Sequence, residues 1–234
     1  MKKAIWILAL IAVIGTAAVL PFLPETVPVH FDAAWNPDRW GSRWELLLLP
    51  AILLILAAAW KPLLKVFEKK AAESEDDKLR ASAETNIKAI GIAGVSLAAV
   101  LTLVQAWLLY QVYRAASGGE TAGTALDRLP FFLLGLVFIV LGNIMPKTRR
   151  NGVIGFRVVW SLYNDETWRR THRFGGCAMV ATGILVVLAA ALVSPPLAVT
   201  VVLLILITAS ILVTLTYAHK VYTEEKERSE KDEN

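Results

Sequence analysis

Six long apolar stretches constrain this chain of 234 residues more than any other feature of its sequence. A helix needs about 20 mainly apolar residues to cross a bilayer, with a usual range of roughly 17 to 25. Six windows meet this requirement: residues 4–20, 44–64, 87–113, 129–145, 175–193 and 197–218. Because hydrocarbon offers no hydrogen-bond partner, a spanning segment must satisfy its own backbone, which favours helices. The sequence therefore predicts an all-α integral membrane protein with six transmembrane helices.

The distribution of basic residues predicts how these helices are oriented. Twenty of the 24 Lys and Arg residues lie before the first window, around the connections that follow the second and fourth windows, or after the sixth. The opposite side holds only Arg39, Arg43, Arg114 and Arg128. Because basic residues are retained on the cytoplasmic side, both termini are predicted to be cytoplasmic, in agreement with an even number of spans.

The first window also has features of a signal peptide, since Lys2 and Lys3 precede its apolar run. That run is long for a signal peptide, however, and two prolines follow it in place of a small-x-small cleavage site. We therefore expect the segment to be retained as the first transmembrane helix.

The pattern of apolar and charged segments divides the chain into four parts. Residues 1–66 form an N-terminal membrane domain with two helices and an external Trp-rich loop, and residues 67–86 form a charged cytoplasmic linker. Residues 87–222 form a four-helix membrane domain with a basic cytoplasmic connector at 146–174, and a charged tail follows at 223–234. We expect the helices beside the linker to extend into it, and the tail to fray.

The external loop between the first two windows combines prolines, tryptophans and a few titratable residues. Its prolines disfavour helix, although Val27–Phe31 is compatible with an extended strand. Trp35, Trp40 and Trp44 suit the headgroup region, so the loop either rests on the membrane or forms a contact surface for a peptide or a lipid headgroup. A metal site made from the nearby His30, Asp32 and Asp38 is the third reading, but their spacing follows no ligand pattern, so we predict no metal.

The connector carries an ordered set of polar residues in addition to its arginines. Asn143 is placed to hydrogen-bond to a neighbouring helix. Asn164 can N-cap a helix that has acidic residues in its first turn. On that helix, Glu166 with Arg170 and Trp168 with His172 stand at i,i+4. Cytoplasmic retention or binding of anionic lipid headgroups would account for the arginines, but neither requires this polar pattern.

The sequence offers little support for catalysis or transport. It has no nucleophile elbow, no zinc-protease motif, no phosphate-binding loop and no dinucleotide fingerprint, so we predict no enzyme and no cofactor. Within the windows Lys88 lies at a boundary and Gln105 is the main polar residue at mid-membrane, which disfavours an ion or proton relay. Gly176, Gly183 and Ala190, at seven-residue spacing, favour a helix-packing face.

The connector resembles the SdpI-type family of bacterial immunity proteins in the order and spacing of its residues. The matching positions are Gly142-Asn143-x-x-Pro146-Lys147, Asn151, Ile154-Gly155-x-Arg157, Trp160 and Glu166-x-Trp168-Arg169-x-Thr171-His172. The external loop is similar to a small membrane domain often found ahead of that family, through Pro28-x-His30-Phe31 and Pro37-Asp38-x-Trp40-Gly41-Ser42. Trp35 departs from this second pattern, which has a glycine between His30 and Pro37.

The resemblance implies a multi-pass protein of the bacterial cytoplasmic membrane that protects against a secreted antimicrobial peptide and sequesters a cognate transcriptional repressor. The expected partners are membrane lipids, a toxic peptide outside and a repressor inside, without direct contact to nucleic acid. The binding residues that it implies are Asn143, Arg157, Trp160, Asn164, Glu166, Trp168, Arg169 and His172 at the connector, and His30 and Asp32 outside. A small permease or lipid-handling membrane protein is the alternative.

Overall fold

The computed structural model describes residues 1–32, 34–119, 125–193 and 196–232. Its long helices are α1 (Lys2–Val19), α2 (Leu48–Glu73), α3 (Asp77–Ala116), α4 (Leu129–Ile144), α5 (Asp165–Leu192) and α6 (Pro196–Asp232). Short 3-10 helices flank several of them: η1 (Leu20–Phe22), η2 (Arg43–Leu47), η3 (Ala125–Arg128) and η4 (Met145–Lys147). Within the described residues, six helical segments are long and apolar enough to cross a membrane. The predicted six-span helical fold is confirmed.

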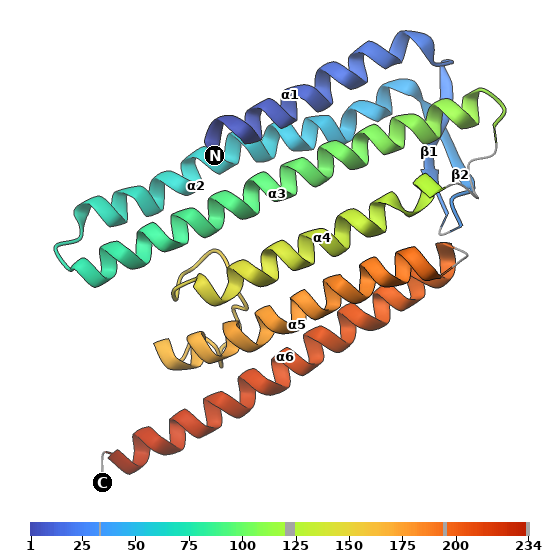
Figure 1. Ribbon diagram of the computed structural model, residues 1–234. Helices are drawn as coiled ribbons and strands as arrows, with labels where there is room; N and C mark the ends of the chain where they lie inside the picture. Colours follow the sequence, from blue (N-terminus) through green and yellow to red (C-terminus); the bar gives the residue numbers. More distant parts are fainter. Residues whose placement is uncertain (33, 120–124, 194–195, 233–234) are drawn as a thin grey trace.

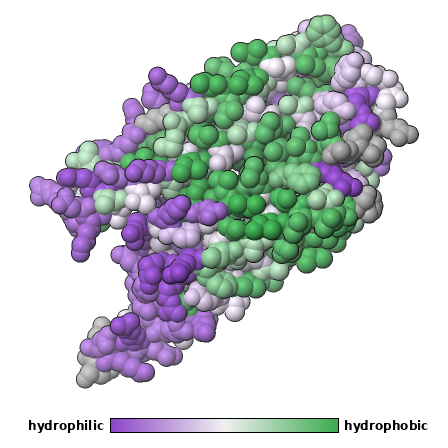
Figure 2. Space-filling model, viewed as in Figure 1, coloured by the Kyte–Doolittle hydropathy of each residue, from purple (hydrophilic) through white to green (hydrophobic). Residues whose placement is uncertain are grey.

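The six helices form two groups of three that lie side by side (Figure 1). Helices α1, α2 and α3 pack against one another, α5 packs between α4 and α6, and contacts between α3 and α4 join the groups. Both termini, the α2–α3 turn and the connector lie at one end, which we call the basic end, and a small β-hairpin lies at the other, the hairpin end. Hydrophilic residues are concentrated at the basic end beside a broad hydrophobic band (Figure 2).

The charged linker is a helical hairpin, because α2 continues to Glu73 and α3 begins at Asp77. Asp76 caps α3 by accepting a hydrogen bond from the Lys78 N–H at 2.7 Å. The expected extension of both helices is confirmed. The predicted boundaries at residues 66 and 86 fall inside these helices, so the division into domains stays a prediction.

The expectation that the charged tail frays is wrong, because α6 continues without a break to Asp232. Lys220–Glu224 and Lys226–Glu230 stand at i,i+4 with 3.9 Å between their charged atoms. Such pairs support an exposed helix that has no apolar face to bury.

The loop between the first two membrane helices, predicted to be external, folds as an antiparallel hairpin of β1 (Thr26–Phe31) and β2 (Pro37–Ser42). The extended Val27–Phe31 segment is thereby confirmed, whereas its pairing with a second strand was not predicted. Val27 is fully buried and packs with Leu23, Leu46 and Val112, so the hairpin is fastened to the helices rather than loosely attached. Trp40 and Trp44 are exposed, as expected of residues at a membrane surface.

Gln105, the polar residue at mid-membrane, joins three segments of the first helical group. Its Nε2 donates to Thr16 Oγ1 of α1 at 2.9 Å and to the Leu46 carbonyl of η2 at 3.0 Å. Both bonds are internal to the fold. A polar side chain with buried partners of this kind holds helices together in a membrane.

Helices α4 and α5 approach each other through paired glycines. A Cβ atom on Gly142 would lie 2.7 Å from the Gly176 carbonyl oxygen, and one on Gly135 would lie 2.8 Å from that of Gly183. The predicted packing face on α5 is confirmed, and Gly135 and Gly142 repeat its seven-residue spacing on α4. This close contact places η4, at the end of α4, beside the first turns of α5.

Candidate functional site at the basic end

The connector between η4 and α5 begins with a turn that is fixed by one side chain. Asn151 Oδ1 accepts from the N–H groups of Val153 and Ile154 at 2.7 and 2.8 Å. Asn151 Nδ2 donates to the carbonyls of Arg149 and Ile154 at 2.7 and 3.0 Å. Four hydrogen bonds to backbone groups give this part of the connector a defined conformation.

His172 and Trp168 join the connector to α5 from inside the protein. His172 is fully buried, its Nε2 accepts from the Phe156 N–H at 2.9 Å, and its Nδ1 lies 2.8 Å from the Trp168 carbonyl. Because Nε2 accepts, the network assigns the hydrogen to Nδ1 and leaves the imidazole neutral. The Trp168 ring stacks on the imidazole at 3.8 Å, and its Nε1 donates to the Thr148 carbonyl at 3.0 Å.

Gly155 is required where the connector crosses these two rings. Its φ of 131° is a conformation that residues with a side chain rarely adopt. A Cβ atom there would overlap His172 Nε2 and lie 2.8 Å from the Trp168 ring. The glycine in the Ile154-Gly155-x-Arg157 pattern therefore allows the backbone to pass close to the rings.

Asn164 begins α5 through a reciprocal cap with Thr167. Its Oδ1 accepts from the Thr167 N–H at 2.7 Å, and Thr167 Oγ1 lies 3.0 Å from the Asn164 nitrogen as acceptor. The predicted N-cap is confirmed. Ser161, just before it, is fully buried and donates to the Phe156 carbonyl, so the end of the connector is also held by hydrogen bonds.

The charged residues on α5 pair differently from the prediction. Glu166 binds Arg169 with two bonds of 2.6 and 2.8 Å, so the expected pairing with Arg170 is wrong. Arg170 instead reaches Glu224 on α6 at 2.7 Å. Packing of α6 against α5 supplies a carboxylate that the sequence of α5 alone does not reveal. The Trp160 ring also contacts α6, through an edge-on contact of 4.8 Å with His219.

The structure brings the predicted connector residues to one end of the molecule but gives them different environments. Trp168 and His172 are buried, and Asn164 and Trp160 contact neighbouring segments of the fold. Arg157 is exposed and has no hydrogen bond or ion pair to any described residue. Asn143 is exposed as well, but it donates to the Ile139 carbonyl of its own helix at 2.9 Å, not to a neighbouring helix as expected.

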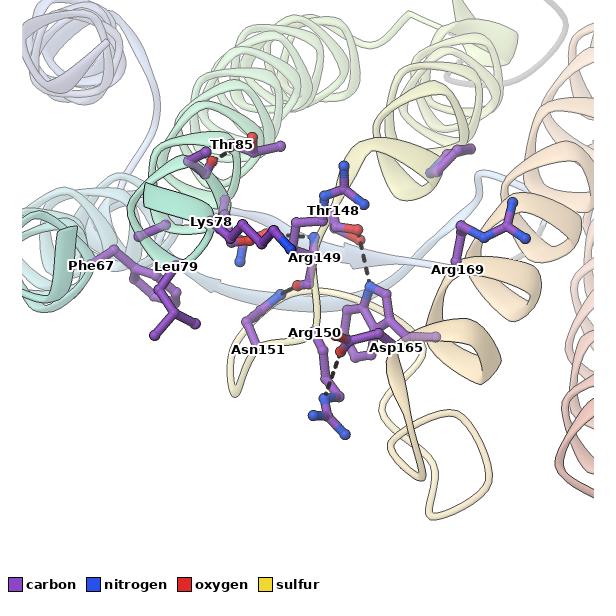
Figure 3. Close-up of a pocket in the computed structure, with 16 residues that line it drawn as sticks. Phe67, Lys78, Leu79, Thr85, Thr148, Arg149, Arg150, Asn151, Asp165 and Arg169 are labelled. Atoms are coloured by element: carbon purple, nitrogen blue, oxygen red, sulfur yellow. Dashed lines mark hydrogen bonds and ion pairs between the residues drawn. The ribbon is translucent and has the colours of Figure 1, made fainter. Parts of the chain in front are cut away.

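A cavity of about 640 Å³ lies between the linker hairpin and the connector (Figure 3). Asn86 of α3, which the sequence reasoning missed, lines it and accepts the Arg149 N–H at 2.9 Å. This bond joins the first helical group to the connector. The available signal was an asparagine immediately before the apolar window that begins at residue 87.

At the hairpin end, His30 and Asp32 have separate partners. His30 Nδ1 lies 2.6 Å from Asp38 Oδ1 across the exposed hairpin. Asp32 accepts from the backbone N–H groups of Asn36 and Ala34, both at 2.8 Å, and from the Asn36 side chain. These bonds, with that from the Asn36 backbone strongest, lower the pKa of Asp32. Asp32 therefore shapes the turn. Within the described ranges no three His, Cys, Asp or Glu residues are grouped to hold a metal.

Trp35 stands in this turn with a φ of 65°, a left-handed conformation that suits glycine. Its ring is half-buried and turns toward the helices. It packs edge-on against Trp107 of α3 at 4.6 Å and lies 6.0 Å from Phe131 of α4. Trp35 thus connects the hairpin to both helical groups.

Comparison with known proteins identifies the part of the chain that contains this connector. Residues 147–218, from the end of η4 through most of α6, match the sequence model of the SdpI/YfhL protein family. This part of the chain is similar to that family. Residues 7–54 match a domain of unknown function, DUF1648, which agrees with the second resemblance at the N-terminus. Together with the six membrane-length helices, the match indicates a multi-pass cell membrane protein.

One curated relative matches a short segment of the chain. An uncharacterized protein of Archaeoglobus fulgidus is 64% identical over 36 residues, which are 15% of the chain. The match spans one fifth of that relative's length. No solved structure matches the chain.

Proposed function

We propose that this protein is a non-enzymatic immunity protein that protects its cell against a secreted antimicrobial peptide. The observation that carries the proposal is the family match over residues 147–218, on a chain with six membrane-length helices. A protein with this architecture lies in the membrane, which is where membrane-active peptides act. The basic end lies in the cytoplasm in this proposal, because basic residues are retained there.

The hairpin end supplies the surface that a peptide from outside would meet. Trp40 and Trp44 have 54% and 59% of their surface exposed, and the His30–Asp38 pair lies on the same hairpin. Exposed aromatic rings with polar groups beside them are frequent in binding surfaces. We therefore expect the peptide to contact His30, Trp40 and Trp44.

Survival of a sensitive bacterium tests the proposed immunity. Cells that express the protein should survive membrane-active peptides that kill cells with an empty vector. Trp40→Ala combined with Trp44→Ala should reduce that protection, whereas Tyr163→Ala, an exposed aromatic at the basic end, should leave it intact at equal protein levels. If survival never exceeds the vector control across the peptide panel, the immunity proposal fails for those peptides.

We propose further that the connector binds a cytoplasmic repressor. Arg157 is exposed, and Val159 beside it has 81% of its surface exposed, while buried residues on either side hold the backbone in one conformation. A surface that is ordered before binding loses less conformational entropy when a partner docks. Val159 is an exposed apolar residue close in sequence to Arg157, which has no ion pair with a described residue. This combination on an ordered loop supports a protein-binding role.

Recruitment to the membrane fraction tests this second activity. A DNA-binding regulator encoded next to this protein should be retained with membranes when both are expressed. Arg157→Ala with Val159→Ser should release it into the soluble fraction, and Arg173→Ala, another exposed arginine of the basic end, should not. Unchanged recruitment by the double variant at normal protein levels would contradict the assignment. Trp168 and His172 are unsuitable for this test, because their substitution disturbs the fold.

A further inference from the structure

Basic side chains outnumber acidic ones in the described lining of the cavity at the basic end. Four cationic side chains line it: Lys78 at the start of α3, Arg149 and Arg150 in the connector, and Arg169 on α5 (Figure 3). Asp165 is its single acidic lining residue. The net positive charge of the described lining therefore favours an anionic ligand over a cationic one.

Only part of this positive charge is neutralised by the protein itself. Arg150 Nε lies 3.1 Å from Asp165, and Arg169 lies 2.6 Å from Glu166, which stands outside the cavity. Lys78 and Arg149 form no ion pair with any side chain in the described part of the chain. Four cations and two paired carboxylates leave two positive charges without a partner, and such a site attracts anions.

Asn86 adds a neutral donor at the inner wall of the cavity. The residue is 3% exposed, and its Oδ1 is occupied by the Arg149 N–H at 2.9 Å. Its Nδ2 has no acceptor among the residues that the structure describes. The amide N–H groups at Nδ2 are therefore available to donate to a ligand oxygen in the cavity.

The position of the cavity in the molecule indicates where its ligand would come from. Much of its lining comes from the segment of α3 between Lys78 and Asn86, just before the apolar stretch of that helix. Pro146 and residues 148–151, just after α4 ends at Ile144, supply another part. The cavity therefore lies at the depth where hydrocarbon gives way to headgroups. Basic pockets at this depth are suited to lipid phosphates.

We propose that this cavity binds a phosphate group, with Lys78 and Arg149 contacting its oxygens and the Asn86 amide donating to one of them. A phosphate has several acceptor oxygens and suits both the arginine fork and the lysine ammonium. The volume of about 640 Å³ exceeds that of a bare phosphate and falls in the range of small-molecule sites. The phosphate belongs either to a phospholipid headgroup or to a soluble phosphate ester. This binding is independent of the proposed immunity and repressor capture.

Binding to the purified full-length protein tests the proposal. The cavity variant is Lys78→Gln with Arg149→Gln, which keeps the Arg149 backbone N–H for Asn86. The matched control is Lys147→Gln with Arg173→Gln, which removes the same charge from exposed residues that do not line the cavity. Native mass spectrometry measures binding of phosphatidylglycerol against phosphatidylcholine, and titration calorimetry measures binding of glycerol 3-phosphate and inorganic phosphate.

The expected result is an affinity for a phosphate probe that falls at least tenfold in the cavity variant and less than twofold in the control. A preference for phosphatidylglycerol identifies a lipid headgroup, and binding of glycerol 3-phosphate without a lipid preference identifies a soluble ester. The proposal is overturned if no probe binds the wild-type protein. Equal losses in the two variants also overturn it, because they would show diffuse attraction to the basic end.

Discussion

At the scale of single residues, the most informative side chain is His172. It was a candidate for direct binding, but it is fully buried, with one ring nitrogen accepting from the connector and the other facing the carbonyl of Trp168. An imidazole fits this place because it combines a donor and an acceptor on opposite sides of a flat ring that can stack. Its role is to position the connector.

Replacing His172 with Phe should therefore destabilise the protein while keeping a ring in place. The part-buried Phe156 N–H would lose its acceptor, at a cost of about 1–3 kcal/mol in the free energy of unfolding. Thermal unfolding in detergent measures the effect. His219→Phe, at an exposed position that also contacts a tryptophan, should change stability by less than about 0.5 kcal/mol. Equal unfolding temperatures for His172→Phe and His219→Phe would show that the hydrogen bonds of His172 contribute nothing to stability.

Trp35 combines an unfavourable backbone conformation with a favourable packing position. At a φ of 65° a residue with a Cβ atom is strained by about 1 kcal/mol or more relative to glycine. We predict that Trp35→Gly is more stable than Trp35→Ala, because both variants lose the ring but only glycine relieves the strain. Trp35→Phe should be the most stable of the three, since it keeps an aromatic ring and the Trp35 Nε1 has no hydrogen-bond partner among the described residues. A lower unfolding midpoint for Trp35→Gly than for Trp35→Ala would refute the left-handed conformation of residue 35.

At the scale of secondary-structure elements, the contact of α4 with α5 positions the connector. Glycines on both helices let the backbones approach, and this contact sets η4 beside the turn of α5 that carries Trp168. Within a membrane, apolar side chains gain little by leaving lipid, so close backbone packing becomes a main source of helix association.

Replacing a glycine with alanine should have opposite effects inside and outside the contact between α4 and α5. Gly142→Ala should lower stability by about 1–3 kcal/mol, because its methyl group would meet the Gly176 carbonyl. Gly15→Ala in α1 has open space around it, and alanine favours helix, so stability should rise by up to about 1 kcal/mol. Thermal unfolding of both variants in one detergent makes the comparison, and a harmless Gly142→Ala would contradict the packing.

At the scale of the whole molecule, the two helical groups and their ends define what each surface can contact. Both termini and the connector lie at the basic end, and the hairpin lies at the opposite end (Figure 1). A partner outside the cell and a partner inside it would therefore meet different parts of the chain, separated by the hydrophobic band (Figure 2).

The orientation of the molecule is predicted by charge and can be measured by thiol labelling. In a Cys177→Ala background, cysteine introduced at the exposed Asn36 of the hairpin should react with a membrane-impermeant reagent in intact cells. Cysteine at Arg173 of the basic end should react only after the cells are permeabilised. The reverse pattern would place the termini outside and overturn the cytoplasmic assignment.

The sequence by itself determined the number of spans, the packing face on α5 and the cap at Asn164. These features depend on local properties: apolar length, residue size at a fixed helical spacing and hydrogen bonds within four residues. It also carried the family resemblance, because the order of residues in the connector is itself a sequence property. The external strand Val27–Phe31 was recognised for the same local reasons.

Only the tertiary structure decided which connector residues are buried and which are exposed. Trp168 and Arg157 look equally suited to binding in the sequence, yet Trp168 stacks on His172 inside the protein and Arg157 is exposed at its surface. The pairing of Arg170 with Glu224 and the bond from the Arg149 N–H to Asn86 each join segments more than 50 residues apart. The second bond lies in the lining of the cavity. Such contacts depend on how helices pack, and side-chain spacing along a single helix carries no record of them.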